Sequence, residues 1–470
     1  MLGIQNNVSA LNAQHNLSRS QNNLNTSIER LSSGFKVNRG ADGPAALVIS
    51  EKQRAQIAGL KTAIDNTDKA VAVVQTAEGA LTEINSLLVK ARSLSIDSAN
   101  TGVNDADALA ANQAEIDNVL DTINRIAANT QFGDSNLLDG SSGLQGTASD
   151  ADVTFLKATT DTSAGSYAVA VTTVAERANT DATLQTAALA AAETLTLNGV
   201  SISLNAGLDQ NAVIDRINEF SGQTGVVADA NGAAGATQLR TEAFGTAATI
   251  DVISDTAAGA TSSGFGTTLV QDSGVNIAGT IGGNAATGSG NVLTGSAGAS
   301  QGIMVSIAED AATLTQTATG AQGNVTIADN SLIFQIGANQ NQTVSISIDS
   351  VESTGLGIGV AGNQFTSLND ISVTSAAGAQ DSIGVIDAAI DEISTLRGTL
   401  GAFQGNTLES TATNMRSTLE NTVNAESVIR DTDFADEISK FTNSQVLVQA
   451  GASVLSSANQ SSQLILSLLG

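Results

Sequence analysis

Apolar residues recur in steps of three and four near the start of the chain, which is the spacing of one helix face. Leu17, Leu24 and Leu31 lie seven residues apart, and Ile28 and Phe35 occupy intermediate steps. A seven-residue apolar repeat is the pattern of a coiled coil. The chain is therefore predicted to open with a helix that carries all five residues on one seam.

Two further helices are predicted before residue 135. Pro44 follows Asp42-Gly43 and suits a first helical position, where its missing N–H costs nothing. The second helix carries a nearly continuous seam of Ile57, Leu60, Ile64, Thr67, Val71, Val74 and Leu81. After a break at 100–105, the third helix repeats the pattern with Leu109, Ile116, Val119, Ile123 and Ile126.

The far end of the chain has the same character. One helix is predicted from about Asp381 to Ile429. The last helix carries one seam of Phe434, Ile438, Phe441, Val448, Ala452, Leu455, Leu466 and Leu469. At 1.5 Å per residue it spans roughly 54 Å, longer than a small globular core needs. We therefore expect both ends to pack against partner helices.

The middle of the chain, about 140–376, changes to Ala, Gly, Thr, Ser, Asn and Asp with alternating strand-like segments. A helix at 211–220 between strand signals suggests a small ββαβ-like module, and 256–300 is expected to be rich in loops. The predicted fold class is α+β. Long terminal α-helices form an intrachain coiled-coil bundle, and a β-rich outer region is inserted between them.

Charge excludes several classes of partner. The formal net charge is −27, and no Lys or Arg occurs from Thr241 to Leu396. Such a chain repels nucleic-acid phosphates and anionic lipid, so we expect neither nucleic acid nor membrane as a partner. No run of 18 apolar residues suggests a membrane span, and no cleavable secretory signal is expected at the start.

The sequence contains few residues of the types that support catalysis or bind cofactors. There is no cysteine and one histidine, His15, so no two-histidine metal site or thiol nucleophile can form. Gly357 to Gly362 fits G-x-G-x-x-G, but no convincing helix follows to hold a pyrophosphate. Gly282 to Gly290 resembles calcium-binding repeats but lacks the ligating aspartate. We expect no enzyme activity, no cofactor and no metal.

The last 30 residues, 441–470, contain no charged side chain and yet keep a helical apolar seam. A solvated helix normally carries charge on its outer face, so this composition favours burial within an assembly. A frayed C-terminus of low complexity is the alternative interpretation.

Several motifs closely resemble the terminal regions of bacterial flagellins. At the start these are Val8 to Gln14, Leu24 to Gly34, Gln75 to Leu81 and Asn129 to Gly133; at the end they are Asn424 to Ala435 and Leu464 to Leu469. The matching ends cover roughly half of the chain. The resemblance implies a structural subunit that polymerises into the flagellar filament for swimming motility, with its middle displayed outside.

The resemblance also implies a domain division. Residues 1–44 with 434–470 would form the inner-core coiled coil. Residues 45–149 with 325–433 would form an inner filament domain, whose small β element includes Phe334 to Gln340. Residues 150–324 would be a variable, surface-exposed β-rich insertion of one or two subdomains. Asp42-Gly43-Pro44 departs from the two acidic residues that flagellins usually carry before this helix.

Partners and location follow from the same resemblance. Flagellins are exported unfolded by the flagellar type III apparatus, so the chain would be secreted and extracellular. Its partners would be further flagellin subunits, an export chaperone, the filament cap and hook-junction proteins. The alternative within the superfamily is a hook–filament junction protein. A flagellin with an enzymatic insertion and a β-rich adhesin are alternatives from other classes.

Two groups of functional residues are predicted. The assembly seam comprises Leu24, Ile28, Leu31, Ile57, Leu60, Ile64, Val71, Val74, Phe434, Ile438, Phe441, Val448, Leu455, Leu466 and Leu469. Lys90, Leu94 and Glu115 align with the residues by which an animal innate immune receptor recognises flagellins. Lys90 stands where flagellins carry an arginine, so the planar set of guanidinium N–H donors is absent at this position.

Overall fold

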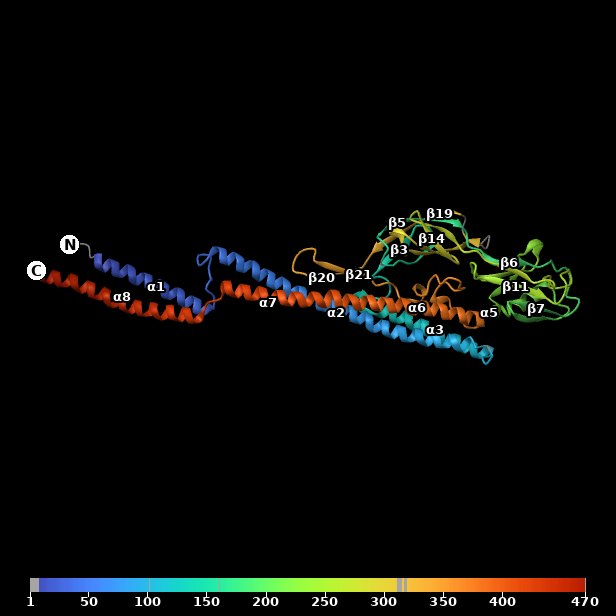
Figure 1. Cartoon of the computed structure of the whole chain (residues 1–470), viewed down its shortest axis with the longest axis horizontal. Helices are drawn as coiled ribbons and strands as arrows, with labels where there is room; N and C mark the ends of the chain where they lie inside the picture. Colours follow the sequence, from blue (N-terminus) through green and yellow to red (C-terminus); the bar gives the residue numbers. More distant parts are fainter. Residues whose placement is uncertain (1–7, 101, 160, 311–314, 317–318, 470) are drawn as a thin grey trace. The chain divides into compact units, whose positions relative to one another are not determined.

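The computed structural model describes residues 8–100, 102–159, 161–310, 315–316 and 319–469, with side-chain exposure described up to 460 in the last helix. Its long helices lie at the two ends of the chain and its strands lie between them (Figure 1). The helices are α1 (Val8–Ser33), α2 (Pro44–Ser98), α3 (Ala106–Asn129), α4 (Gln210–Asn218), α5 (Ser221–Thr224), α6 (Ala376–Ala402), α7 (Ser410–Arg430) and α8 (Phe434–Leu469). The predicted α+β class is confirmed.

The helix predicted at 381–429 is interrupted. A π-helical segment, Phe403–Glu409, separates α6 from α7. By contacts the chain divides into two units. Unit 1 contains Met1–Asp68, Gln335–Thr343 and Glu409–Gly470, and unit 2 contains Lys69–Phe334 and Val344–Leu408. This division differs from the three-part division expected from sequence, because α2 contributes to both units.

Unit 1 contains two pairs of helical segments. In the first, α1 and α8 run alongside each other in opposite directions (Figure 1). An antiparallel bridge between Phe35 and Asp431 joins the segment after α1 to the segment before α8. There the Lys36 N–H also donates to the Arg430 carbonyl (2.8 Å). In the second, the start of α2 packs on α7 through a small core of Leu60, Ala63, Ile64 and Met415.

A short β element completes unit 1 and continues into unit 2. Strands β20 (Leu332–Gln335) and β21 (Thr343–Ile346) form a two-stranded sheet. In the segment that connects them, Ala338 lies against Gly59 of α2, where an added Cβ would be 3.1 Å from the Ala338 Cβ. Gly59 therefore lets this connection approach the helix closely.

The helical part of unit 2 is a packed bundle of α2, α3 and α6. Its core side chains are almost fully buried: Leu81, Ile84, Leu88, Ile116, Ile123, Val385, Ile386 and Ile393. The Asp105 side chain caps α3 by accepting from the Ala108 N–H (2.9 Å). A short hairpin of β1 (Gln131–Phe132) and β2 (Ser135–Asn136) follows α3.

The largest sheet of unit 2 has eight antiparallel strands. Their order is β3 (Leu144–Ala148), β19 (Gly320–Asp329), β5 (Gly165–Thr173), β13 (Ala278–Ile281), β14 (Asn284–Ser289), β15 (Val292–Gly295), β16 (Met304–Ile307) and β4 (Val153–Lys157). Alternate residues such as Val169, Val171 and Val305 form its core. The hairpin β17 (Glu309–Asp310) and β18 (Thr315–Gln316) follows β16.

A second β-rich part of unit 2 contains the predicted module. A four-stranded sheet has the order β12 (Val270–Ser273), β11 (Thr249–Ser254), β7 (Glu193–Leu197) and β8 (Val200–Leu204). A three-stranded sheet has the order β6 (Arg177–Asp181), β10 (Gln238–Phe244) and β9 (Val226–Asp229). Val213 and Ile217 of α4 are fully buried in the shared core. The succession β7, β8, α4, β9 agrees with the ββαβ-like prediction.

The expectation of a loop-rich 256–300 agrees with 256–269, which contains no strand, but from 270 onward it misses four strands, β12, β13, β14 and β15. These strands are rich in small residues, so they lack the alternation of large apolar and polar residues by which strands are predicted from sequence. At Gly279 an added Cβ would lie 2.3 Å from the Ala170 carbonyl oxygen, and at Gly288 it would lie 1.5 Å from that of Ile277. These strands pack so closely that a side chain is excluded, and the usual alternation of large apolar residues is lost.

Candidate functional site

The contact between α1 and α8 follows a strict seven-residue repeat. Of the α8 side chains at 434–460, those that are not exposed are Glu437, Phe441, Ser444, Val448, Gly451, Leu455 and Ala458. The corresponding positions of α1 are Ala13, Leu17, Ser20, Leu24, Ser27 and Leu31. Steps of four and three alternate in both sets. The two helices therefore form an antiparallel coiled coil within one chain.

Large and small residues alternate along this seam. A Cβ added at Gly451 would lie 3.3 Å from Leu17 Cδ1 and 3.6 Å from Leu17 Cβ, so the absent side chain makes room for the leucine. The same antiparallel offset places Ser444 opposite Leu24. Because Leu17 meets a residue without a side chain, the two backbones approach closely at this point.

A polar cluster interrupts the seam near the end of α1 and the start of α8. Glu437 is almost fully buried, and its Oε1 accepts a hydrogen bond from Ser27 Oγ (2.7 Å). The other carboxylate oxygen lies 3.7 Å from Arg30 Nη1. A buried carboxylate is tolerated only with such partners, so this cluster favours one alignment of the helices. Sequence reasoning missed Glu437, although it lies four residues before Phe441 in the repeat.

The structure separates the predicted terminal seam residues into two faces. Leu24, Leu31, Phe441, Val448 and Leu455 lie on the α1–α8 seam. By contrast, Ile28, Phe434 and Ile438 are about half exposed, at 48%, 53% and 52%. These three residues therefore lie outside the seam between α1 and α8, and their part in assembly stays a prediction. The physical reason for their placement is close packing, since the smaller Ser27 faces α8 where Ile28 was expected.

The last two seam residues, Leu466 and Leu469, lie on the helical backbone of α8. Their side chains are outside the described residues. Within α2, Leu60 and Ile64 belong to the small core of unit 1, and Ile57 is half-buried. Further along α2, Val74 is fully buried and Val71 is half-buried in unit 2.

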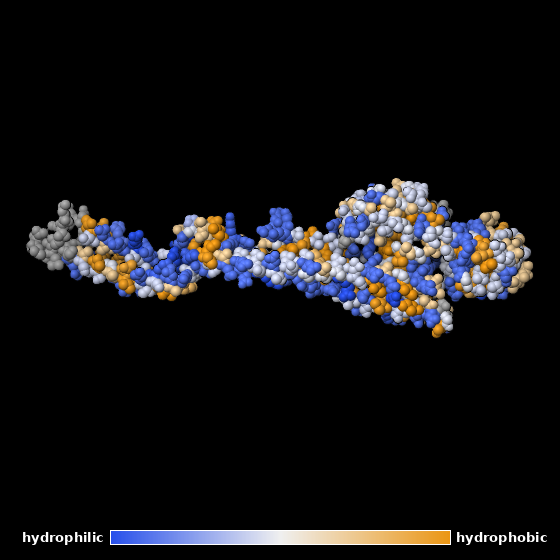
Figure 2. Space-filling model, in the orientation of Figure 1, coloured by the Kyte–Doolittle hydropathy of each residue, from blue (hydrophilic) through white to orange (hydrophobic). Residues whose placement is uncertain are grey.

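Unit 1 exposes many large apolar side chains. They are Val8, Leu11, Ile28, Val48, Ile49, Val423, Val428, Phe434, Ile438, Val446, Leu447 and Val454, each at least 41% exposed. Hydrophobic residues gather along the terminal helices on the face drawn in Figure 2. A single chain leaves this apolar surface in water, which is characteristic of a surface that contacts other molecules.

Charge is distributed unequally between the units. Unit 1 holds 10 Lys and Arg against 12 Asp and Glu, whereas unit 2 holds the remaining 9 against 34. Their formal charges are therefore −2 and −25. Unit 1 combines exposed apolar surface with near neutrality, so its copies can approach without strong repulsion.

The three residues aligned with receptor recognition lie in unit 2. Lys90 Nζ is 2.7 Å from Glu115 Oε1, which joins α2 to α3, and both side chains are about half exposed. Leu94, one turn after Lys90, is half-buried. The structure thus brings Lys90 and Glu115 together in a surface ion pair.

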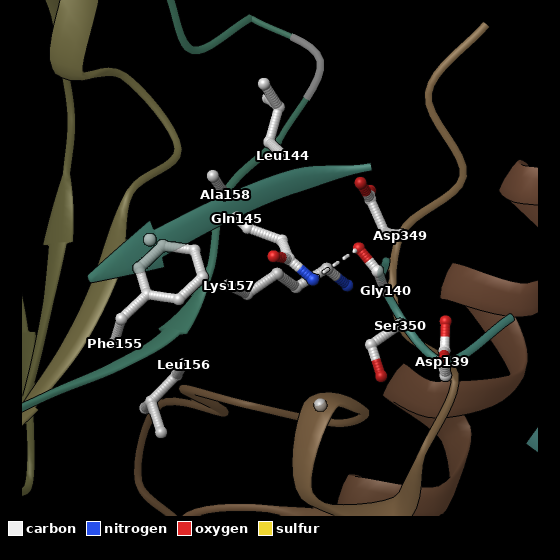
Figure 3. A pocket seen from close by; sticks show the side chains of 12 residues that line it. Asp139, Gly140, Leu144, Gln145, Phe155, Leu156, Lys157, Ala158, Asp349 and Ser350 are labelled. Carbon is white, nitrogen blue, oxygen red and sulfur yellow. Dashed lines mark hydrogen bonds between the residues drawn. The ribbon is translucent and has the colours of Figure 1, made fainter. Parts of the chain in front are cut away.

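A cavity of about 340 Å³ lies in unit 2 beside β3 and β4. Phe155, Lys157 and Asp349 line it (Figure 3). Lys157 Nζ is held by Glu392 of α6 at 2.8 Å. Burial raises the pKa of the Asp349 carboxyl, and the positive charge of Lys157 opposes that rise. The ion pair between Lys157 and Glu392 fixes β4 against α6.

Other site chemistry is sparse. Among the residues that the structure describes, no three His, Cys, Asp or Glu side chains are grouped so as to hold a metal ion. Within the same residues, no helix has the length and apolar character to span a membrane. Gly357, Gly359 and Gly362 have positive φ angles in a loop, and the next α-helix begins only at Ala376.

Long terminal helices with exposed apolar faces and a separately packed β-rich middle define a self-assembling structural subunit. Comparison with known proteins identifies the family. Models of the bacterial flagellin N-terminal and C-terminal helical regions match residues 4–143 and 383–469. A B-type flagellin of Pseudomonas aeruginosa is 35% identical over 511 aligned residues, covering 100% of this chain and 99% of that protein. The chain belongs to the bacterial flagellin family.

Flagellin D of Vibrio anguillarum is also similar, at 30% identity over the whole of both chains. Among solved structures, FliC from Burkholderia pseudomallei aligns with 73% of this chain and 99% of its own, at 15% identity and a TM-score of 0.24, which is too low to support a structural argument. Family membership makes this chain a structural subunit of the flagellar filament, which is extracellular. Like other flagellins, it assembles with further copies of itself.

Proposed function

We propose that this flagellin polymerises through the apolar faces that α1, α7 and α8 leave exposed in a single chain. The observation that carries this proposal is the contrast within α8. Phe441, Val448 and Leu455 face α1, whereas Val446, Leu447 and Val454 are more than half exposed. A helix with two apolar faces and only one intrachain partner requires a second partner to bury the other face. Neighbouring subunits supply it.

Deletion of residues 441–470 tests the proposal. The truncated chain is expected to form no filaments, because it loses both faces of α8, while unit 2 stays folded. Electron microscopy measures assembly, and circular dichroism with thermal melting measures folding of unit 2. Filaments of ordinary length from the truncated chain would refute the proposal.

The outer β-rich region is proposed to be dispensable for polymerisation. The insertion expected at 150–324 cuts through the large sheet, whose strands extend from Leu144 to Asp329. A better junction joins 143 to 330, since the Asn330 N–H already donates to the Gly143 carbonyl (3.1 Å). A short linker there should give thinner filaments in electron micrographs. Loss of assembly with folded terminal helices would refute this division.

Export and capping are proposed to follow the family pattern. The subunit would leave the cell unfolded through the flagellar type III apparatus, with an export chaperone, and would meet the hook-junction and cap proteins outside. The absence of cysteine supports this route, because no disulfide can hinder an unfolded chain. Secretion by a strain that lacks the apparatus would contradict it.

Recognition by an animal innate immune receptor is proposed for Lys90, Leu94 and Glu115. The ion pair between Lys90 and Glu115 holds two charged contacts beside a half-buried leucine. Signalling by receptor-bearing cells should fall with Leu94→Ala or Glu115→Ala and should be unchanged by Asp121→Ala, which alters an exposed acid on α3. Equal signalling by all three variants would refute this assignment.

The subunit is also proposed to be purely structural, without enzymatic activity in its outer region. The only histidine in the sequence, His15, lies in α1 and does not line the two cavities described in unit 2. Assembled filaments should therefore show no protease activity on a general protein substrate. Activity that persists after purification and is lost on excision of the outer region would contradict the proposal.

A further inference from the structure

Unit 1 contains an apolar cleft between α2 and α7, with a volume of about 400 Å³. Its floor is formed by Phe35, Ile57, Ala58 and Val423. Val423 is 41% exposed, so the cleft remains open to water in a single chain. An open apolar floor of this kind suits an apolar side chain from another molecule.

The lining of the cleft carries three basic side chains and one acidic side chain, Glu426, although the chain as a whole is strongly acidic. Arg54 and Lys61 lie at the rim, and the guanidinium carbon of Arg430 lies over the Phe35 ring, 4.5 Å from the ring centroid. Arg54 and Arg430 share one carboxylate, that of Glu51, at 3.1 and 3.2 Å. Lys61 has no ion pair with the described residues. The rim can therefore accept further negative charge.

The complementary feature lies at the turn between α2 and α3. Val103 is 79% exposed, more than any other large apolar residue described. Asp97, Asp105 and Asp107 flank it, and no Lys or Arg occurs from 93 to 124. Asp107 is exposed, and no hydrogen bond or ion pair engages its carboxylate within the described residues. An apolar tip surrounded by carboxylates matches an apolar cleft with a basic rim.

We propose that the cleft of one subunit binds the α2–α3 turn of a second copy of this chain. Val103 packs on the apolar floor beside Ala58, and Asp107 faces Lys61. The proposal rests on the polymerisation proposed above. Because the two surfaces differ, the contact is heterologous, and its repetition generates an open filament when the rotation between copies does not close a ring.

Disulfide trapping tests the contact directly, since the chain contains no native cysteine. Filaments of the Val103→Cys, Ala58→Cys double variant are oxidised, dissolved and run on a non-reducing denaturing gel. A cysteine pair within disulfide reach links each subunit to the next, so a ladder of covalent multimers is expected. The control pair is Val103→Cys with Gln56→Cys, an exposed position on α2 outside the cleft lining, and it should give no ladder.

Charge reversal tests the rim independently. Lys61→Glu and Asp107→Lys should each slow seeded elongation roughly two- to fivefold, as expected for an exposed ion pair. The double variant should recover to within about twofold of the unmodified chain, because the pair is restored with reversed signs. Lys52→Glu, an exposed control on α2 outside the cleft, should have a smaller effect than Lys61→Glu.

The outcomes distinguish this contact from polymerisation itself. Ordinary filaments without a ladder, or a double variant as slow as the product of its single variants, would overturn the contact and leave the proposed function standing. Normal elongation of both single variants would also overturn it and would leave the cleft to a different partner. Failure of the unmodified chain to polymerise would overturn the proposed function.

Discussion

The two units of this flagellin bury their apolar residues in different ways. In unit 2, Leu195, Leu197, Ile202 and Leu204 are almost inaccessible to water, in a core closed by strands and a helix of the same chain. In unit 1, the α2–α7 core is a cluster of four buried residues, and twelve large apolar side chains remain exposed. The comparison shows that unit 2 closes a large apolar core within one chain, whereas unit 1 leaves many of its large apolar side chains in water, which supports the proposal that neighbouring copies cover them.

The charge difference supports the same conclusion. Unit 2 carries a formal charge of −25 and unit 1 carries −2. The negative charge is therefore concentrated in unit 2, and most of the exposed large apolar side chains are in unit 1. The following predictions test this separation, in order of expected effect.

The largest effect is expected from Leu455→Asp in α8. The substitution places an unpaired carboxylate in the α1–α8 seam, and a buried unpaired charge is far more costly than a lost contact. No filaments should form at any salt concentration, as judged by electron microscopy. Ala285→Asp, on exposed strand β14 of unit 2, is the matched control and should assemble normally. Filaments of the Leu455→Asp chain would show that unit 1 does not need this seam.

A core substitution in unit 2 should lower the stability of that unit and leave filament assembly unchanged. Ile202→Ala removes a fully buried side chain and should destabilise the surrounding sheets by about 2–4 kcal/mol. Thermal or urea unfolding of unit 2 measures the loss. Filament formation below the new melting temperature should be unchanged. Coupled loss of stability and assembly would show that the two units are not energetically separate.

Salt should alter the rate of assembly moderately. The Debye length falls to roughly 8–10 Å at moderate ionic strength, which screens repulsion between the acidic units, unit 2, of different copies. Added NaCl should therefore speed elongation from seeds a few-fold, followed by light scattering, and should not rescue Leu455→Asp. A rate that falls as salt rises would mean that attractive ion pairs dominate the contacts.

The smallest effect is expected at the cavity of unit 2. Burial raises the pKa of Asp349 above its ordinary value, so the folded chain holds this proton to a higher pH than the unfolded chain does. Stability is then lost as pH rises through the interval between the two pKa values, and the penalty persists above it.

Asp349→Asn should remove that penalty and raise the melting temperature of unit 2 slightly at pH 7. The gain should vanish below the unfolded pKa of the carboxyl. Asp391→Asn, at an exposed position of α6, is the control. An equal gain at pH 3 and pH 7 would exclude titration of Asp349 as the cause.

The sequence by itself determined the long helices, the β-rich middle and the family, because helix periodicity and terminal motifs are local and long. The final helix, α8, begins at Phe434 as its repeat predicts. Likewise, the buried Val213 and Ile217 lie on the α4 face that the sequence marked. The excess of acid in the outer region could also be counted without coordinates.

Only the tertiary structure decided which face of each terminal helix meets its partner. In α1, the sets Leu24, Ile28, Leu31 and Leu24, Ser27, Leu31 fit the apolar repeat almost equally, and hydrophobicity favours the first. Packing selects the second, because Ser27 donates to Glu437 across the seam (2.7 Å) and leaves room for a close approach. The strands around Gly279 and Gly288 were decided in the same way, by carbonyl groups of distant segments that leave no space for a Cβ. Such contacts join residues that are remote in the chain, so no local pattern records them.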